Sequence, residues 1–341
     1  MGLWDLLMDS AFIASHSDAS ATVTPSDLSI IIVSWNVREL LIRCLTALSS
    51  EEVRGALRVE IIVVDNASTD GSAEAARAFP GVRLIANRRN LGYGRANNQG
   101  FQAARGSYLM VLNPDTVPQP GSLEALVEFA EAQPKAGIVA PRLLNADMTV
   151  QAAAFHFPTL LMASIDLFPL PRIVPGRVRR WLAESPLNGR YPGEAKAAQP
   201  FRIDHPLGAC MLISRRAYEC VGGFDPAIFM YSEEVDLAVR FAKAGWGCWQ
   251  VPSARVVHLG GQSTRQMPDR MFIELWRSRL YFYSKHYSPA ARLALGALLA
   301  VSQLLEIVLA LFRLAVGKLP RRLASRRLRM APEIIRLVFG R

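Results

Sequence analysis

The sequence predicts an α/β protein with a doubly wound, mostly parallel sheet, followed by an apolar or amphipathic helical appendage at its C-terminal end. Two observations predict the sheet: short apolar runs recur through the first part of the chain, and segments of helical length separate them. Strands that are apolar along their whole length are typical of parallel sheets covered by helices on both faces. A third observation, an apolar segment at 293–312 followed by a basic tail, predicts the appendage.

The alternation of strands and helices can be followed in order from the first apolar run. Apolar and β-branched residues predict four strands, at 28–34, 59–64, 82–86 and 108–112. Helices are expected between these strands, at 39–49, 72–78 and 93–104. Open sheets of this kind bind ligands at the carboxyl ends of their strands, so the polar residues that follow each strand are the candidate site residues.

The N-terminal segment and the cysteines indicate the compartment. Residues 1–27 are expected to form a leader or linker, because Asp5 and Asp9 interrupt their apolar cluster and the basic start of a secretory signal is missing. The cysteines form no Cys-x-x-Cys pair, which favours buried thiols in a reducing compartment over a zinc site or a disulfide framework. They are Cys44, Cys210, Cys220 and Cys248.

The positive charge is concentrated at the C-terminal end. Residues 313–341 contain nine basic residues and a single acid, so they carry +8 of the net charge of +10. The apolar segment 293–312 is long enough to cross a bilayer. However, Ser302 and Glu306 share one helical stripe with Arg313, so a helix lying in the interface fits equally well, with the basic tail on anionic headgroups. A buried helix packed on the domain is the remaining alternative, and no nucleic-acid partner is expected because aromatic residues do not alternate with the basic ones.

Polar residues follow the second and third predicted strands. Asp65 could accept hydrogen bonds from a base imide or a ribose hydroxyl, whereas Asp70 could also cap the next helix, which is the commonest role of an aspartate there. The glycine-rich segment 90–100 lacks the third glycine of a dinucleotide fingerprint. Its Gly92 could instead allow the close approach of a pyrophosphate, with Arg95 nearby.

The tripeptide Asn113-Pro114-Asp115 follows the fourth predicted strand. A carboxylate at this strand end is suited to anchor a hard cation that carries a phosphate. An ordinary turn between a strand and a helix explains the tripeptide equally well. On these residues alone, both interpretations remain open.

Taken in order, these segments resemble glycosyltransferase family 2, a family of inverting enzymes with the GT-A fold. The resemblance is closest to the rhamnosyltransferase-like branch that builds bacterial cell-surface polysaccharide. It rests on the segments 32–36, 63–72, 90–94 and 113–115.

The resemblance covers about residues 28–265 and implies a GT-A domain there. Its nucleotide-binding half is expected at 28–118, and its acceptor and catalytic half at 119–265. The second half contains an insertion at 155–201, which is rich in Pro, Arg and aromatic residues and has no clear period. Residues 266–341 are expected to form a helical, basic region that associates with the membrane.

The resemblance also implies roles for single residues. Asp65 would bind the nucleotide base, and Asp115 would hold a divalent cation, Mg²⁺ or Mn²⁺, that bridges the phosphates of a nucleoside-diphosphate sugar. Asn113 replaces the first acid of the family's Asp-x-Asp motif and brings no charge. His258 stands where related enzymes place a metal-binding histidine, and we expect it to be the second ligand. The other residues assigned to the nucleotide sugar are Asn36, Asn66, Asp70, Gly92, Arg95, Asn97 and Asn113.

The catalytic base is expected at the start of a helix near residue 233. Acids at a helix N-terminus are favourable in any protein, but an inverting transfer also needs a carboxylate that deprotonates the acceptor hydroxyl. The base in the family's Glu-Asp-x-Asp-Leu motif corresponds to Glu234, with Glu233 as the alternative. Asp236 and Arg240 are expected to form a supporting ion pair.

These assignments predict a metal-dependent, inverting hexosyltransferase. It would add one sugar, rhamnose being the sugar that the family branch suggests, to a lipid-linked or cell-surface glycan acceptor. We expect it on the inner face of the cell membrane, as a peripheral or monotopic protein. A processive synthase is disfavoured, because residues 266–270 do not match the Gln-x-x-Arg-Trp motif of such enzymes.

Two other classes remain as alternatives. A sugar-nucleotide pyrophosphorylase would need a phosphate loop rich in Gly and Arg after the first strand, where this chain has Trp35-Asn36-Val37-Arg38. A non-catalytic, nucleotide-binding scaffold at the membrane would be excluded by detectable sugar transfer.

Overall fold

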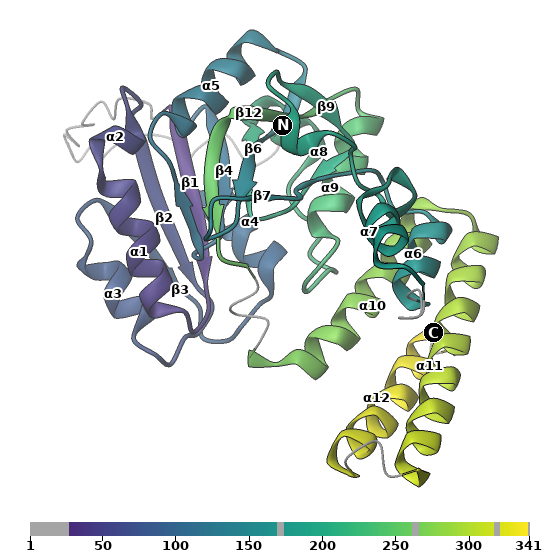
Figure 1. Cartoon of the computed structure of the whole chain (residues 1–341). Helices are drawn as coiled ribbons and strands as arrows, with labels where there is room; N and C mark the ends of the chain where they lie inside the picture. The colour runs from purple at the N-terminus through teal and green to yellow at the C-terminus, as the bar shows by residue number, and fades with distance from the viewer. Residues whose placement is uncertain (1–26, 169–173, 261–265, 317–320, 340–341) are drawn as a thin grey trace, which may run out of the picture.

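The computed structural model describes residues 27–168, 174–260, 266–316 and 321–339, and for 321–329 only the backbone. The expected leader therefore lies outside the described residues, apart from Asp27. Figure 1 shows a central sheet covered by helices, from which two long C-terminal helices extend.

The first half of the sheet has the predicted parallel order. Its elements are β1 (Leu28–Ser34), α1 (Arg38–Ser49), α2 (Glu51–Arg54), β2 (Val59–Asp65), α3 (Ser72–Ala78), β3 (Val82–Ala86), α4 (Tyr93–Ala103) and β4 (Tyr108–Leu112). Four strands lie in the order β3-β2-β1-β4, and each neighbouring pair is parallel. Gly100 brings α4 close to this sheet, because a Cβ atom there would lie 2.4 Å from Ile31 Cγ2.

The second half of the sheet is mixed. Its elements are β5 (Thr116–Pro118), α5 (Ser122–Ala132), β6 (Ala136–Leu144), β11 (Cys210–Ser214), α8 (Arg215–Val221), α9 (Glu233–Lys243) and β12 (Gly247–His258). Strand β11 runs antiparallel between β4 and β6, and β5 runs antiparallel to β12. Strands β6 and β12 keep the direction of the first four, so the carboxyl ends of β1, β2, β4 and β12 lie along one edge.

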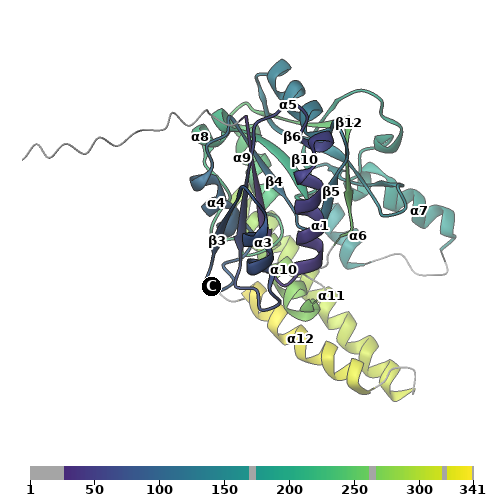
Figure 2. The same cartoon turned by 90° about the vertical axis from the view of Figure 1, so that its left-hand side faces the viewer.

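Helices cover both faces of the sheet, which confirms the predicted doubly wound α/β class (Figure 2). Ile30 and Ile32 pack in a core with α1, α3 and α5, whereas Ile31, which points to the other face, packs in a core with α4, α8 and α9. These isoleucines are fully buried, as expected for strands that are apolar along their whole length.

The chain between β6 and β11, which includes the predicted insertion at 155–201, forms short elements. They are β7 (Val150–Gln151), β8 (Ala154–Phe155), α6 (Leu160–Leu167), α7 (Gly176–Glu184), η1 (Pro186–Asn188), η2 (Glu194–Lys196), β9 (Phe201–Ile203) and β10 (His205–Pro206). Strands β7 and β9 pair with β6 and β12, while β8 and β10 form a separate two-stranded sheet. The residues around the insertion are therefore paired with the carboxyl end of β6 through β7 and with the amino end of β12 through β9.

The chain ends in three helices, α10 (Pro268–His286), α11 (Pro289–Ala315) and α12 (Arg321–Phe339). A Cβ atom on Gly296 would lie 2.9 Å from Val338 Cγ1, so the start of α11 packs beside the end of α12 as an antiparallel pair. Among the described helices, only α11 is long and apolar enough to cross a membrane by length and composition, with a mean hydropathy of 2.2 and 33% of its apolar stretch buried.

Candidate active site

A cavity of about 250 Å³ opens at the edge of the sheet where the candidate residues lie. Residues after β1, β2 and β4, the end of β12 and the start of α9 line it. Six of the predicted site residues are among them: Asn66, Asn113, Asp115, Glu233, Glu234 and His258. The other six lie outside the cavity: Asn36, Asp65, Asp70, Gly92, Arg95 and Asn97.

Asp115 and His258, the two predicted metal ligands, lie side by side in this cavity. Nε2 of His258 is 3.5 Å from Oδ1 of Asp115, and each residue is only 7% exposed. The pairing of β5 with β12 brings them together, because His258 aligns with Thr116, the residue after Asp115. A carboxylate and an imidazole at this spacing are ligands that one divalent cation can share.

Gln151 orients the imidazole ring of His258. Its Oε1 lies 2.7 Å from Nδ1 of the ring, and its Nε2 donates to Asn145 Oδ1 at 3.2 Å. Because Gln151 Oε1 can only accept, Nδ1 carries the proton and the lone pair of Nε2 faces Asp115. Burial lowers the pKa of His258, although the charge of Asp115 opposes this, so the ring is neutral at pH 7. Metal-binding histidines are typically held by a partner of this kind.

Among the described residues, Asp115 and His258 are the two strong ligands at this point. The described residues hold no group of three or more His, Cys, Asp or Glu side chains arranged for a metal ion. Oδ1 of Asn113 lies 3.1 Å from the hydroxyl of Tyr93, which also lies 2.7 Å from the carbonyl oxygen of Gly208. The residues therefore fit a cation that takes its other ligands from phosphate and water.

Two glutamates begin α9 on another wall of the cavity. Left-handed backbone at Tyr231 (φ 69°) and Ser232 (φ 66°) turns the chain into this helix. Glu233 is 3% exposed, and its Oε2 has no hydrogen-bond partner in the part of the chain that is described. Burial, and then the charge of Glu234, raise the pKa of Glu233 well above its usual range.

Glu234 is the glutamate of this pair that titrates near neutral pH. Burial raises the pKa of its carboxyl group to about 7. Its side chain passes over the backbone of Gly208, where a Cβ atom would lie 3.5 Å from three carbons of the glutamate. A carboxylate with this pKa at the cavity wall is suited to accept a proton from a bound hydroxyl.

Asp65 lies at the end of β2, just outside the cavity. It is 3% exposed, and its Oδ2 accepts a hydrogen bond from the backbone of Ser68 at 3.0 Å. Its Oδ1 has no partner within the described ranges, nor has the hydroxyl of Ser34, which aligns with Asp65 on the neighbouring strand. Asn36 holds the two loops together by accepting from the backbone of Thr69 at 2.8 Å. The free oxygen of Asp65 is compatible with a donor group from a nucleotide.

Asp70 holds the ends of two helices. It accepts hydrogen bonds from the backbone N–H of Ser72 at 3.0 Å and of Arg38 at 2.8 Å, the first residues of α3 and α1. Both are N–H groups that a helix leaves without internal partners. The structure thus gives Asp70 the capping role that was the alternative to nucleotide binding.

The remaining predicted residues shape the packing of α4 and the loop before α9. A Cβ atom on Gly92 would lie 2.4 Å from the carbonyl oxygen of Phe229, so only glycine fits there. Arg95 Nε donates to the carbonyl of Pro226 at 2.6 Å. Asn97, which is fully buried, donates to the backbone of its own helix. These contacts support the cavity wall without reaching the cavity.

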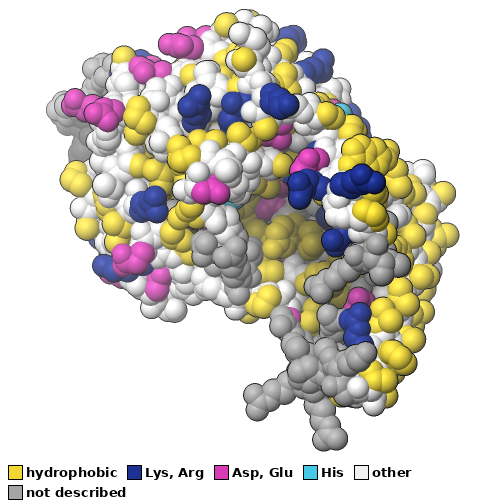
Figure 3. Space-filling view, viewed as in Figure 1, with side chains coloured by type: hydrophobic (Ala, Val, Ile, Leu, Met, Phe, Trp, Pro, Cys, Tyr) yellow, Lys and Arg dark blue, Asp and Glu magenta, His cyan; other side chains and the backbone are white. Residues whose placement is uncertain are grey.

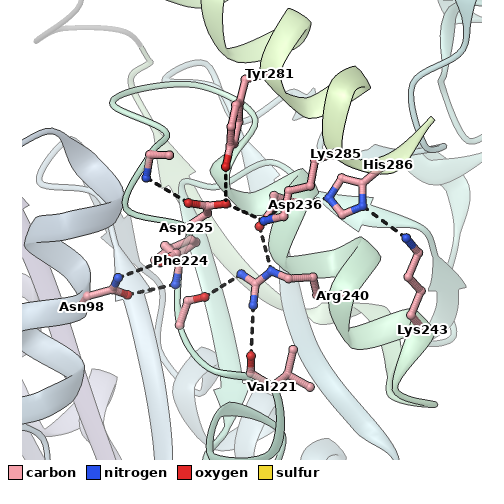
Figure 4. A network of polar contacts seen from close by, with 12 residues as sticks. Asn98, Val221, Phe224, Asp225, Asp236, Arg240, Lys243, Tyr281, Lys285 and His286 are labelled. Atoms are coloured by element: carbon pink, nitrogen blue, oxygen red, sulfur yellow. Dashed lines mark hydrogen bonds and ion pairs between the residues drawn. The ribbon is translucent and has the colours of Figure 1, made fainter. Parts of the chain in front are cut away.

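A buried ion network ties the helix of the glutamates to the C-terminal helices (Figure 4). Asp236 on α9 is fully buried and lies 2.8 Å from Arg240, which confirms the predicted ion pair. Lys285 and His286 of α10 also reach Asp236, each at 2.7 Å. Burial alone would raise the pKa of Asp236, but these hydrogen bonds lower it. Helix α10 therefore fixes the position of the helix that begins with Glu233 and Glu234.

Three residues of the site escaped the sequence-based prediction. Gln151 lies 107 residues before His258, just ahead of the predicted insertion, and no motif in the sequence connects the two residues. Tyr93 and Tyr231 line the cavity, and neither motif spacing nor charge distinguishes them from core tyrosines. The sequence indicated a role for these tyrosines only through their neighbours, since Tyr93 lies in the glycine-rich segment and Tyr231 just before the acidic one.

The fold of the protein is of the GT-A type, with its cavity at the carboxyl edge of the sheet. Two solved structures share the fold. One is the mannosyltransferase PcManGT from Pyrobaculum calidifontis in complex with GDP-Man and Mn²⁺, with a TM-score of 0.52 and 16% identity over 94% of this chain and 89% of that one. The other is GalNAc-T7 with UDP, GalNAc and Mn²⁺, with a TM-score of 0.51 and 18% identity; it matches 76% of this chain, which covers half of that one.

Sequence comparison then identifies the family. The model of the family described as glycosyl transferase family 2 matches residues 29–222. The N-acetylglucosaminyl-diphospho-decaprenol L-rhamnosyltransferase of Mycobacterium tuberculosis is 32% identical over 76% of this chain and 85% of its own length. The chain belongs to glycosyltransferase family 2, and its similarity to a rhamnosyltransferase agrees with the predicted branch. The family favours neither the pyrophosphorylase nor the scaffold alternative.

Proposed function

We propose that this protein is a metal-dependent, inverting glycosyltransferase that moves one sugar from a nucleoside diphosphate to a lipid-linked acceptor. The observation that carries the proposal is that Asp115, His258 and Glu234 line one cavity at the carboxyl edge of the sheet. The relative from M. tuberculosis is named for rhamnosyl transfer to N-acetylglucosaminyl-diphospho-decaprenol. By extension, rhamnose is the proposed sugar and a lipid diphosphate sugar the proposed acceptor class.

The donor is proposed to bind with its base near β2 and its phosphates at the cation ligands. Asp65 Oδ1, which lacks a partner among the described residues, would accept a hydrogen bond from the base. Asp115 and His258 would hold Mg²⁺ or Mn²⁺, and this cation would offset the charge of the departing diphosphate. Gln151 keeps Nε2 of His258 free to bind it.

Glu234 is proposed as the base. Its carboxylate takes the proton of the acceptor hydroxyl while that oxygen bonds to the anomeric carbon of the sugar. The bond from the same carbon to the diphosphate oxygen breaks on the opposite face, so the configuration inverts. Glu233 is proposed to stay protonated, because its pKa lies well above the usual range. Its neutral form avoids a second negative charge beside the base.

A transfer assay tests this function. The protein, Mn²⁺ and a panel of nucleoside-diphosphate sugars are incubated with a prenyl diphosphate N-acetylglucosamine, and the products are read by mass spectrometry and NMR. We expect one added sugar, with the anomeric configuration opposite to that in the donor. A product with retained configuration, or a polymer, would contradict the proposal.

We further propose that α11 lies in the membrane interface rather than across the bilayer. The helix exposes large apolar side chains along its length: Leu293, Val301, Leu304, Leu305, Val308, Leu311 and Phe312. Five arginines occur in residues 321–329 of α12, at the end of the helix pair farthest from the catalytic domain (Figures 1 and 2). If α11 crossed the bilayer, these arginines would have to pass through the hydrocarbon core to reach the other side. Moving charged side chains through the core is strongly unfavourable.

Vesicle flotation tests this membrane contact. The wild type is expected to float with vesicles that contain anionic phosphatidylglycerol and to bind pure phosphatidylcholine weakly, because apolar burial and cation attraction act together. Leu304→Glu is expected to weaken flotation, whereas Met148→Glu, at a residue of similar exposure (54%) on a turn of the catalytic domain, is not. The interface model would be contradicted if the floated fraction changed neither with the charge of the lipid nor with Leu304→Glu.

A further inference from the structure

A second cavity, of about 330 Å³, adjoins the first. The two share Leu207, Tyr231 and Glu234, so the residue proposed as the base lines both. Residues of the insertion line one side of the second cavity, and residues of α10 and α11 line the other. Figure 3 shows the surface hollowed between the sheet domain and the C-terminal helices, with basic side chains at the rim.

Arg190, one of the two arginines in this cavity, makes no ion pair with any described residue. It follows η1, and its guanidinium lies 4.7 Å from the centre of the Phe155 ring. Its charge helps to lower the pKa of the Glu194 carboxyl group, which burial raises, but no ion pair joins it to a carboxylate in the described part of the chain. A guanidinium held over an aromatic ring, with no ion pair to occupy it, is well suited to bind phosphate through its planar set of N–H donors.

The second arginine, Arg279, comes from α10. Its Nη2 lies 2.9 Å from Asp166 of α6, and its guanidinium lies 4.9 Å from the centre of the Trp276 ring. Asp166 is 43% exposed, so water screens this pair and an anion could share the arginine. Arg190 thus adds to the cavity a guanidinium that forms no ion pair with a described residue, beside one whose ion pair with Asp166 is exposed to water.

A buried hydroxyl in the same cavity also lacks a partner. Tyr283 of α10 is 2% exposed, and its hydroxyl makes no hydrogen bond to any described residue. Leaving a buried hydroxyl unpaired costs about 1–3 kcal/mol, so a ligand oxygen bound there would relieve that cost. The hydroxyl is a second, independent sign that this cavity receives a polar ligand.

We propose that the second cavity binds a phosphate of the acceptor, with Arg190 and Arg279 as its anion-binding residues and the Tyr283 hydroxyl as a further donor. The ligand class is a sugar with a lipid diphosphate at its anomeric carbon, so the inference rests on the proposed function. Glu234 lies at the junction of the cavities, where the acceptor sugar would meet the donor sugar. Leu275 and Leu295 give an apolar wall for the start of the lipid, next to α11.

Kinetics with paired acceptors test the phosphate site. Transfer is measured to a prenyl diphosphate N-acetylglucosamine and to an octyl glycoside of the same sugar, which lacks phosphate. Arg190→Gln is expected to lower kcat/KM for the diphosphate acceptor about tenfold more than for the octyl glycoside, the size of a lost charged hydrogen bond. Arg216→Gln, at an exposed arginine on α8, should change neither value. Equal losses with the two acceptors would overturn the phosphate site and leave the proposed function standing.

Direct binding of a prenyl diphosphate tests the phosphate site even if no sugar transfer is detected. Calorimetry with farnesyl diphosphate is run in EDTA. Without a divalent cation, the diphosphate of this probe cannot bind at the cation ligands, where the diphosphate of the donor is proposed to lie. Binding that weakens about tenfold in Arg190→Gln and in Arg279→Gln, but not in Arg216→Gln, supports the site even when every transfer assay fails. Equal binding by all four proteins would overturn it.

Discussion

Glu234→Gln is expected to reduce kcat for sugar transfer by about 10²–10⁴-fold, the usual contribution of a general base. The amide has the shape of the carboxyl group but cannot accept the proton of the acceptor hydroxyl. Donor binding should stay near that of the wild type, because the cation ligands lie outside α9, with Asp115 between β4 and β5 and His258 at the end of β12. Steady-state assays and calorimetry with the donor nucleoside diphosphate measure the two quantities.

Two matched variants make this result specific. Glu233→Gln replaces a carboxyl group that is neutral and buried in our account, so a far smaller loss of kcat is expected. Glu219→Gln, at an exposed position on α8, controls for the loss of a surface charge. If Glu233→Gln abolished transfer and Glu234→Gln did not, Glu233 would be the base.

Asp115→Asn is expected to remove metal-dependent activity and to lower kcat/KM by at least about a hundredfold. A carboxylate supplies most of the charge for the cation, which contributes several kcal/mol to the stabilisation of the departing diphosphate. The thermal shift that Mn²⁺ produces with the donor nucleoside diphosphate should disappear in the variant. Asp147→Asn, at an exposed turn aspartate, should leave that shift unchanged.

Substitution of Gln151, which holds the ring of His258, tests the same cation site with a smaller expected effect. Gln151→Leu removes the acceptor that holds the ring, so Mn²⁺ should bind about 10–100-fold more weakly, as for other residues that orient metal ligands. EDTA should stop transfer by the wild type, and added Mn²⁺ or Mg²⁺ should restore it. Full activity in EDTA, or an unchanged Mn²⁺ shift in Asp115→Asn, would rule out the metal role of these residues.

The parts of the fold that depend on local pattern could be predicted from the sequence. The strands at 28–34 and 108–112 have the predicted bounds, because a run of apolar residues between turn residues defines a buried strand locally. The direction of β11 could not be predicted in this way. It depends on where the chain returns to the sheet after the insertion, which is a long-range property of the fold.

The same distinction holds within the site. Asp115 could be named because it follows a strand, and His258 because related enzymes have a metal-binding histidine there. Their 3.5 Å contact, however, depends on the pairing of β5 with β12. The hydrogen bond by which Gln151 orients the ring of His258 joins residues 107 positions apart, and no sequence motif indicates it. Asp70 shows the opposite case, since a short polar residue before a helix is suited both to capping and to binding a ligand.

The pH dependence of kcat tests the assignment of Glu234 most directly. The base acts only when deprotonated, and burial raises its pKa to about 7, so kcat should rise about tenfold per pH unit below that value and level off above it. Glu234→Gln should lose this rise, whereas Glu219→Gln should keep it. A wild-type kcat that is constant from about pH 5 to 8, or a rise that persists in Glu234→Gln, would contradict Glu234 as the base.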